Sequence, residues 1–363
     1  MLCCSNFHEE NGMQTIELPH KVLDYSCPIN GLEDQYEWKT GTRLPGYFLM
    51  DLSTIGFLYI RNKLAPVPRM LFWGSGMGKA QHEFLAEIIG YRWAYHEGGT
   101  FKNAWQNVLA QVHQGQPVIF GLLDMYHLPY FEKFYHRVHI PQHFLQVIGF
   151  DGARDAAIVL DNSLPEPQFV PLRDLQSAWN VNVPGQGKPF TCYVLTFGDQ
   201  IATPQEIAVK GLKKRAQVYL NPPNSRLGCL AMEKAARDIP NWPTDLSEPQ
   251  FKACLESLAT FTCSVVPNLP QALLPFPLGY EDAHQACRDR FAAELTEMAE
   301  HCHQPHWLDA ANGFSASGVK IGELTDMAVQ TLQGKRQAFK QAGPLLTEIQ
   351  QLETKAFHYL ANA

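Results

Sequence analysis

The clearest pattern of hydrophobic and polar positions is a set of three short apolar runs in the first half of the chain. The first, at residues 117–124, follows a glycine and ends in an aspartate, and its length predicts a buried strand. The second run, at 144–150, follows His143, and an Asp-Gly turn leads from it to the third run at 156–160, which stops at Asp161. This pattern predicts a β-hairpin that brings His143 and Asp161 to the same end of a sheet.

A helical pattern precedes these runs. Residues 28–38 place apolar side chains on one face, and Pro28 suits the first turn of a helix. Cys27 is therefore predicted to lie at or just before a helix N-terminus, where unpaired N–H groups and the helix dipole stabilise a thiolate. Asn30 and Gly31 count against this helix because both are poor helix formers.

Further elements follow from the same periodicities. Residues 47–60 fit either one helix or two short strands, and the pattern does not decide between them. The other elements expected before residue 200 are strands at 15–18, 70–73 and 190–197 and helices at 80–89, 100–115 and 171–179. Beyond residue 203 the patterns are helical, at 204–220, 230–237, 248–261, 280–301, 321–339 and 345–360.

This change of pattern divides the chain into domains. We expect a loose tail at 1–14, an α+β domain at 15–200 and a mostly helical carboxy-terminal domain at 201–363.

Composition narrows the functional classes. A net charge of −7 argues against a nucleic-acid binder, which normally presents a basic surface. Nine cysteines, an odd number without repeated spacing, indicate free thiols in a reducing compartment. Neither a signal peptide nor an apolar stretch near the roughly 18 residues of a membrane span is evident, so a cytoplasmic protein without membrane contact is expected. A basic run at 210–215 is predicted to be a solvated helix face.

Cys27, His143 and Asp161, in that chain order, have the layout of a papain-like cysteine enzyme. The thiolate of Cys27 would attack a carbonyl carbon, His143 would transfer protons, and Asp161 would hold the imidazole tautomer. Taken singly, each signal is weak, because most lone cysteines and histidines are packing residues and an Asp-Asn pair is common in turns. Backbone N–H groups at the helix start, with Tyr25 or Ser26, are candidates to bind the oxyanion.

A second group of candidates lies between the predicted strands. Residues 124–139 are rich in aromatic and imidazole groups, and this stretch either lines a pocket or is an irregular loop packed by its own aromatics. Asp124 is a candidate for either the residue that orients the base or a substrate contact, Tyr126 is a candidate substrate contact, and His139 is the alternative base. The histidines of this stretch have no standard zinc spacing, so no metal site is expected.

Several ordered motifs resemble the butirosin biosynthesis protein H family. They are LDYSCPINGL at 23–32, GQPV at 115–118 with LDMYHLPY at 123–130, HIPQHF at 139–144 with GFD at 149–151, and AWN at 178–180. The resemblance to the amino-terminal domain of that family covers about residues 15–200, and the remainder is similar to the helical domain that accompanies it.

The resemblance implies a papain-like fold with Cys27 as nucleophile, His143 as base and Asp161 as its partner. It also implies an acyltransferase that takes an acyl group from the pantetheine thioester of an acyl carrier protein and passes it to a small amine, with no cofactor beyond that pantetheine arm. The basic run at 210–215 is the candidate surface for the acidic carrier protein. A thiol hydrolase such as a peptidase or amidase, a non-catalytic binding protein with this fold, and assembly as a homo-oligomer all stay open.

Overall fold

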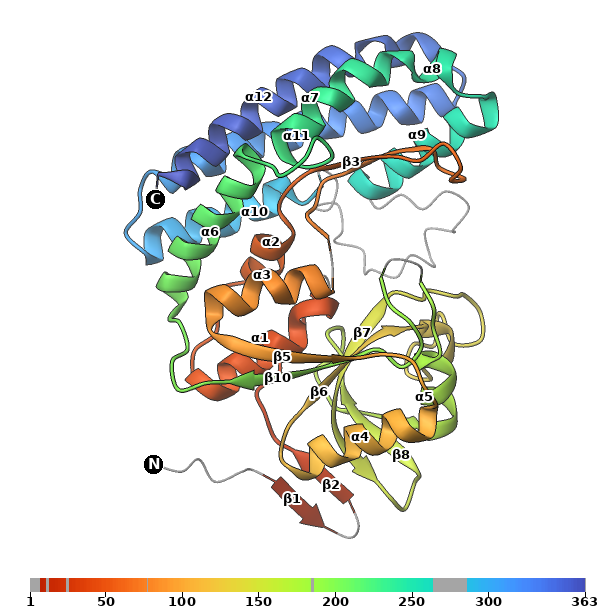
Figure 1. Cartoon of the computed structure of the whole chain (residues 1–363), viewed down its shortest axis with the longest axis vertical. Helices are drawn as coiled ribbons and strands as arrows, with labels where there is room; N and C mark the ends of the chain where they lie inside the picture. The colour runs from red at the N-terminus through yellow and green to blue at the C-terminus, as the bar shows by residue number, and fades with distance from the viewer. Residues whose placement is uncertain are drawn as a thin grey trace. The chain divides into compact units, whose positions relative to one another are not determined.

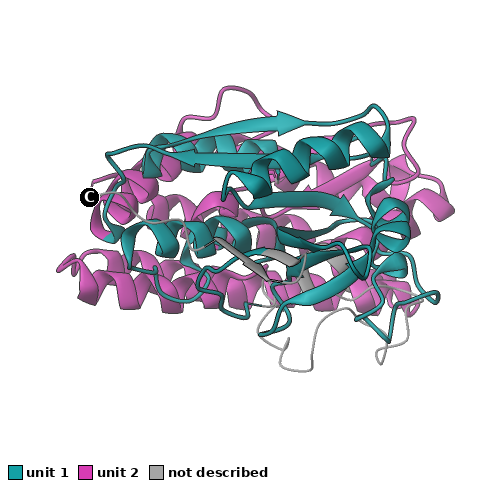
Figure 2. Cartoon of the chain, turned by 90° about the horizontal axis from the view of Figure 1, so that it is seen from below, with its two compact units in different colours: residues 1–50, 77–204 teal, residues 51–76, 205–363 magenta. Residues whose placement is uncertain are grey.

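The chain forms two compact units (Figure 2). The computed structural model describes residues 7–10, 13–23, 26–76, 78–183, 186–263 and 286–362. Unit 1 comprises Met1–Met50 and Met77–Pro204, and unit 2 comprises Asp51–Gly76 and Gln205–Ala363. Residues 51–76, which the sequence patterns include in the domain at 15–200, thus belong to unit 2.

Unit 1 is an antiparallel sheet with helices on both faces (Figure 1). Its strands are β1 (Phe7–Glu10), β2 (Met13–Ile16), β5 (Tyr91–His96), β6 (Val118–Leu123), β7 (His143–Asp151), β8 (Ala156–Leu160), β9 (Gln168–Pro171) and β10 (Cys192–Phe197). Its helices are α1 (Cys27–Thr40), α3 (Lys79–Ile89), α4 (Phe101–His113), the short 3-10 helix η1 (Met125–His127) and α5 (Leu172–Trp179). The strand order is β1-β2-β7-β6-β10-β5, with β8 and then β9 attached to the other edge of β7. The predicted α+β class and antiparallel sheet are confirmed.

The register of the sheet separates its two faces. Ile119 of β6 lies opposite Gln146 of β7 and Tyr193 of β10, so these three side chains share one face. Helix α1 covers this face so closely that a Cβ on Gly31 would come within 2.8 Å of the Ile119 side chain. A glycine that seemed to weaken the predicted helix is therefore what lets the helix approach the sheet.

The opposite face carries the main apolar core of unit 1. Phe120 of β6 stacks on Trp179 of α5, with ring centroids 3.9 Å apart. Apolar residues of α4, including Trp105 and Val108, complete this core. The hairpin that positions the site is thus held on one face by α1 and on the other by α4 and α5.

The amino-terminal hairpin departs from the sequence expectation. Strands β1 and β2 pair with each other, and β2 pairs with β7 through residues 13–15. The segment 1–14, expected to be a loose tail, therefore contains one strand and the start of another. Strands of four residues are too short for alternation to reveal, because their pairing depends on backbone hydrogen bonds to a distant strand.

Unit 2 is mostly helical, as predicted. Its elements are β3 (Leu58–Arg61), β4 (Arg69–Phe72), α6 (Pro204–Leu220), α7 (Gly228–Asp238), η2 (Ile239–Asn241), α8 (Trp242–Asp245), α9 (Glu248–Cys263), α10 (Arg288–His301), α11 (Trp307–Leu332), η5 (Arg336–Gln341) and α12 (Ala342–Ala361). Helix α2 (Phe48–Thr54) includes the last residue of the first segment of unit 1, Met50, and the first residue of unit 2, Asp51. The undecided residues 47–60 thus form one helix and one strand, which neither alternative described. Over the described ranges, no helix has the length and apolar character needed to cross a membrane.

Helix α11 begins earlier than the pattern at 321–339 suggested. It runs from Trp307 through Gly313, where a Cβ would lie 3.0 Å from the Cβ of Ala356 on α12. Small residues that resemble a break in the sequence therefore mark a close contact between two helices.

The basic run at 210–215 is only partly solvated. Arg215 is buried and donates hydrogen bonds to the backbone carbonyls of Leu52, at 3.2 Å, and Ser53, at 2.6 Å. Lys210 and Lys213 are the exposed residues of the run.

A buried ion pair lies within the helical core of unit 2. The Nε of Arg288 donates to Glu353 at 2.7 Å, and its Nη2 also donates to the backbone carbonyl of Gly56 at 3.0 Å. Ser317 donates to the same carboxylate at 2.9 Å. Both charged side chains are almost wholly buried, so each depends on the other for its solvation.

We predict that Glu353→Ala destabilises unit 2 by about 3–5 kcal/mol, because it leaves the Arg288 guanidinium buried without its carboxylate. Urea unfolding followed by tryptophan fluorescence measures the loss. The control Glu323→Ala removes one of the two surface carboxylates that pair with Lys320 and should leave the unfolding curve unchanged. A similar curve for both variants would contradict the prediction.

Candidate active site

Cys27 is the first residue of helix α1, as the sequence predicts. Its side chain is partly exposed, Pro28 occupies the first turn, and the first turn holds no acidic residue. A helix N-terminus offers N–H groups without intrahelical partners, so the thiol lies where negative charge is stabilised.

The hairpin of β7 and β8 brings His143 and Asp161 together. His143 is the first residue of β7, and Asp161 follows the last residue of β8 directly. The Nε2 atom of His143 lies 2.6 Å from Oδ2 of Asp161, and both side chains are buried. The predicted proximity of these two residues is therefore a direct hydrogen bond in the structure.

The electrostatics of this pair favour a charged imidazole. Burial alone would lower the pKa of His143, but the charge and hydrogen bond of Asp161 outweigh it, and a hydrogen bond to the Cys27 side chain adds to the effect, so the pKa is raised. Because Nε2 faces Asp161, Nδ1 is the ring nitrogen left for the thiol of Cys27. The imidazole is thus bonded to the carboxylate of Asp161, and its pKa also responds to the thiol of Cys27.

Other side chains hold the Asp161 carboxylate in place. Tyr130 Oη donates to Oδ2 at 2.8 Å, while the backbone N–H and the hydroxyl of Ser163 donate to Oδ1 at 3.1 and 2.6 Å. Burial would raise the pKa of Asp161, but His143 and these donors lower it. The ring of Phe131 packs edge-on against His143, with centroids 5.3 Å apart. The result is a carboxylate fixed in its ionised form.

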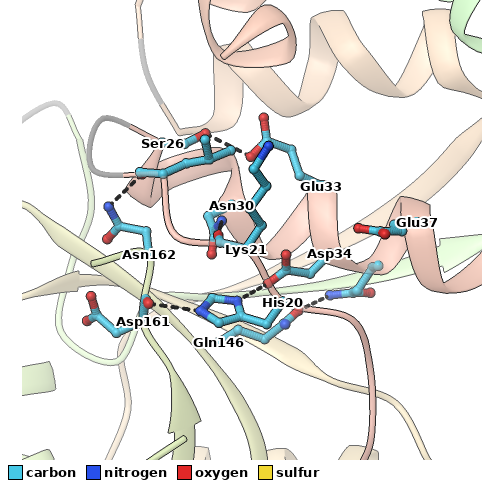
Figure 3. Close-up of polar contacts among 12 residues, drawn as sticks. His20, Lys21, Ser26, Asn30, Glu33, Asp34, Glu37, Gln146, Asp161 and Asn162 are labelled. Atoms are coloured by element: carbon cyan, nitrogen blue, oxygen red, sulfur yellow. Dashed lines mark hydrogen bonds and ion pairs between the residues drawn. The ribbon is translucent and has the colours of Figure 1, made fainter. Parts of the chain in front are cut away.

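Tyr25 and Ser26, the side-chain candidates for binding the oxyanion, directly precede Cys27. Tyr25 lies outside the described residues. Ser26 is fully buried and its hydroxyl donates to Glu33 Oε2 at 3.0 Å (Figure 3), so that proton is already in use. The backbone at the start of α1 is thus the better source of donors than the Ser26 hydroxyl.

Asp124, Tyr126 and His139 form a second, more exposed group. Asp124 Oδ2 lies 2.6 Å from Nδ1 of His139, and its Oδ1 accepts hydrogen bonds from the backbone N–H groups of Tyr126 and Ile140. The rings of Tyr126 and His139 stack at 4.0 Å, and the His139 side chain is 66% exposed. His139 is therefore paired with its own carboxylate and is separate from the pair of His143 with Asp161.

Both pairs nevertheless lie at the same end of the sheet. Leu123, the last residue of β6, is in register with His143, and Asp124 follows it. Surface side chains from the loop at 124–140 therefore stand beside the strand end that carries His143. Within the described parts of the chain, no group of three or more His, Cys, Asp or Glu side chains has a metal-binding arrangement.

Sequence patterns did not reveal the residues that support the site. Tyr130 and Ser163 contact Asp161, and His20 and Asn162 join the segment before Cys27 to the segment that holds Asp161 (Figure 3). Only Ser163 carried a local signal, because an Asp followed two residues later by Ser is typical of a turn closed by the Asp side chain.

We predict that Asp161→Asn lowers the free energy of unfolding of unit 1 by about 1–3 kcal/mol, with a loss that depends on pH. The pKa of His143 is higher in the folded protein than in the unfolded chain, where it is about 6.5. The stability that the charged imidazole contributes is therefore fully present below about pH 6.5 and is lost as pH rises through the pKa of the folded state. The lowered pKa of Asp161 makes its contribution present above about 3.9 and lost as pH falls through the folded value. The loss should therefore be greatest between about pH 4 and 6.5.

Denaturant unfolding at a series of pH values measures this difference. Asp151→Asn is a matched control in the same hairpin, because its ionic partner Arg154 stays charged. The loss of unfolding free energy in this control should therefore not decrease at alkaline pH. A loss for Asp161→Asn that is no greater between about pH 4 and 6.5 than at more acid or more alkaline pH would contradict the prediction.

Comparison with known families agrees with this geometry. Residues 26–162 match the family model described as Butirosin biosynthesis protein H, N-terminal, a range that includes Cys27, His143 and Asp161. Residues 173–263 match the model described as Domain of unknown function (DUF4872). Among curated proteins, none matches the chain. With these two domains in this order, the chain belongs to the butirosin biosynthesis protein H-like family.

Proposed function

We propose that this protein is a cysteine-dependent acyltransferase of a biosynthetic pathway. The observation that carries the proposal is the buried imidazole of His143, which lies 2.6 Å from the carboxylate of Asp161. Cys27 stands at a helix start, and its interaction with the imidazole helps to raise the pKa of His143. The family name, that of a butirosin biosynthesis protein, supports synthesis rather than degradation. The donor we propose is a thioester on the pantetheine arm of an acyl carrier protein, and the acceptor is a small amine.

The first half-reaction would acylate Cys27. The thiolate attacks the carbonyl carbon of the thioester, and the tetrahedral intermediate expels the pantetheine sulfur. The imidazolium of His143 gives its proton to that leaving thiolate. The products are an acyl thioester on Cys27, a neutral His143 and a free pantetheine thiol.

The second half-reaction would return the site to its starting state. A neutral amine attacks the acyl carbon, and His143 accepts a proton from the amine nitrogen. The bond from the acyl carbon to Cys27 breaks, which releases the amide and regenerates the thiolate beside the imidazolium. Asp161 stabilises that imidazolium and keeps Nδ1 directed at the sulfur.

Backbone N–H groups would hold the oxyanion in both steps. The start of α1 supplies the N–H of Cys27 and the positive end of the helix dipole next to the reacting carbon. The Ser26 hydroxyl has a smaller part in this proposal, because it donates to Glu33.

The exposed group at the same sheet end is our candidate for acceptor binding. Tyr126 offers an aromatic ring that stacks with His139, and Asp124 adds negative charge that attracts a protonated amine, which loses a proton to solvent before it attacks. His139 would thus bind acceptor, while His143 serves as the base.

We predict that Cys27→Ala abolishes transfer from any thioester donor, because no other group on the proposed path can form the acyl intermediate. Intact-mass spectrometry after mixing with an acyl thioester, before amine is added, should show one acyl adduct that maps to Cys27. The variant should show no adduct at that position. An unmodified Cys27 with every thioester donor, or undiminished transfer by the variant, would refute the proposal.

The same acylated protein separates transferase from hydrolase. If water removes the acyl group from Cys27 as fast as added amine does, the protein is a thiol hydrolase, the alternative function. If no adduct forms and Cys27 alkylates slowly below pH 7 without dependence on pH, the fold serves binding alone.

We predict that Tyr126→Ala raises KM for the amine about threefold to tenfold and leaves acylation of Cys27 unchanged. Loss of one aromatic stacking contact costs about 0.5–1.5 kcal/mol. Phe169→Ala, which removes an exposed aromatic ring from β9, is the control and should change neither parameter. Slower acylation in Tyr126→Ala would show instead that the ring supports the catalytic residues.

A further inference from the structure

His20 lies between the helix that carries Cys27 and the segment that carries Asp161. Its Nδ1 is 2.6 Å from Oδ2 of Asp34 on α1, and its Nε2 is 3.1 Å from the backbone carbonyl of Asp161 and 3.0 Å from that of Leu164. Figure 3 shows that Asp161 turns its backbone carbonyl toward this ring and its carboxylate away from it. His20 therefore contacts the main chain of Asp161 without entering the reacting site.

These contacts identify the protonation state of His20. All three partners are oxygen atoms that accept hydrogen bonds, so both ring nitrogens must carry a proton and the imidazole is a cation. Burial alone would lower the pKa of His20, but the hydrogen bond and charge of Asp34, together with the carbonyls of Leu164 and Asp161, raise it. The side chain is 5% exposed and that of Asp34 is fully buried.

Charged groups near His20 lie on α1 and on the residues that follow it. Arg43 donates to the other oxygen of Asp34 at 2.9 Å and also pairs with Glu37 at 2.7 Å. Glu33 lies 4.0 Å from the same guanidinium. The Asp34 carboxylate is thus shared by the Arg43 guanidinium and the His20 imidazole.

Neighbouring hydrogen bonds extend the connection. We call residues 20–23 the lead-in segment, since they precede the helix of Cys27. Leu23 and Asn162 are bonded in both directions, with the Leu23 N–H donating to the Asn162 carbonyl at 2.8 Å and the Asn162 side chain donating to the Leu23 carbonyl at 2.9 Å. Asn30 of α1 donates to the carbonyl of Lys21 at 3.0 Å. The lead-in segment therefore joins α1 to the chain just after β8.

We propose that His20 is a positioning residue, a buried cation that fixes Asp161 relative to Cys27 by bonding α1 and the Asp161 main chain at once. The proposal rests in part on the proposed function, because its effect is on the thiol chemistry of Cys27. The imidazole of His143 can serve both partners only when the carboxylate and the sulfur stay at a constant separation. A displacement of about 1 Å in such a site can cost about a hundredfold in rate.

The proposal includes a dependence on pH. A neutral imidazole has one N–H group, so it cannot donate to Asp34 and to the two carbonyls together. The connection is complete below the raised pKa of His20 and weakens as pH rises through it. Any loosening of Asp161 then weakens the stabilisation of the His143 imidazolium.

The test compares His20→Gln with His82→Gln. His82 is a buried histidine on α3 of the same unit. In the described part of the chain, its ring is bonded to Tyr91 at 2.9 Å and packs against Trp93 and Tyr193. Its pKa is lowered by burial to about 4, so it is the neutral counterpart of His20. Both variants make the same substitution at a buried imidazole. Urea unfolding compares their unfolding free energies, so that an effect on rate is not confused with a loss of stability.

Two rates are measured across pH 5 to 10. One is acylation of Cys27 by an activated thioester, and the other is alkylation of the Cys27 peptide by iodoacetamide, followed by mass spectrometry. His20→Gln should slow acylation about 10-fold to 100-fold and should slow alkylation at pH 6. In this variant, the alkaline limb of the pH–rate profile, where the acylation rate falls at high pH, should also move to lower pH. His82→Gln should leave both rates within about threefold of wild type and the alkaline limb unmoved.

Each outcome bears on the proposal. Equal profiles for the two variants would overturn it. If His20→Gln does not fold, Asp34→Asn is the second variant, because it keeps an oxygen acceptor for Nδ1 of His20 while removing the charge. An alkaline limb of the acylation profile that does not move in this variant would overturn the proposal as well. If wild type takes no acyl group from any thioester, the proposed function fails on its own, and the alkylation profiles still decide the role of His20.

Discussion

A buried imidazole and carboxylate remain charged only when other polar groups replace the water that each has lost. In unit 1 this constraint falls on His143 and Asp161, and much of the surrounding polar structure meets it. Tyr130 and Ser163 supply donors to the carboxylate, and the thiol of Cys27 helps to raise the pKa of the imidazole. The charges are thus stabilised by groups from several separate segments, which places strict demands on how those segments meet.

Two histidine–aspartate pairs of unit 1 differ in how far they are exposed to solvent. His143 with Asp161 and His139 with Asp124 have the same bond length and lie at the same end of the sheet. The first imidazole is 7% exposed and the second is 66% exposed. Water screens the exposed pair, whereas the buried pair holds its charges in a medium of low dielectric constant. This contrast, rather than residue type, supports assigning proton transfer to His143 and recognition to His139.

The sequence predicted the parts of the site that depend on local pattern. The start of α1 at Cys27 and the hairpin from His143 to Asp161 follow from helix-start chemistry and from apolar runs separated by a turn. The sequence did not reveal His20 or Tyr130, because each acts on Asp161 through a contact between distant residues that leaves no periodic signal. It also misread Gly31 as a weakness of the helix, since only the packed sheet shows why a side chain would not fit there.

The bonds between the lead-in segment and the residues after β8 have a consequence for folding. They connect positions 141 residues apart for His20 and Asp161, and 139 apart for Leu23 and Asn162. Contacts of such sequence separation form late, because the loop they close is long and its entropy must be lost first. A nascent chain that has exposed only its first hundred residues holds the helix of Cys27 without its imidazole. Under the proposed chemistry, the reactivity of that thiol depends on the docking of the chain just after β8, not only on the helix on which Cys27 lies.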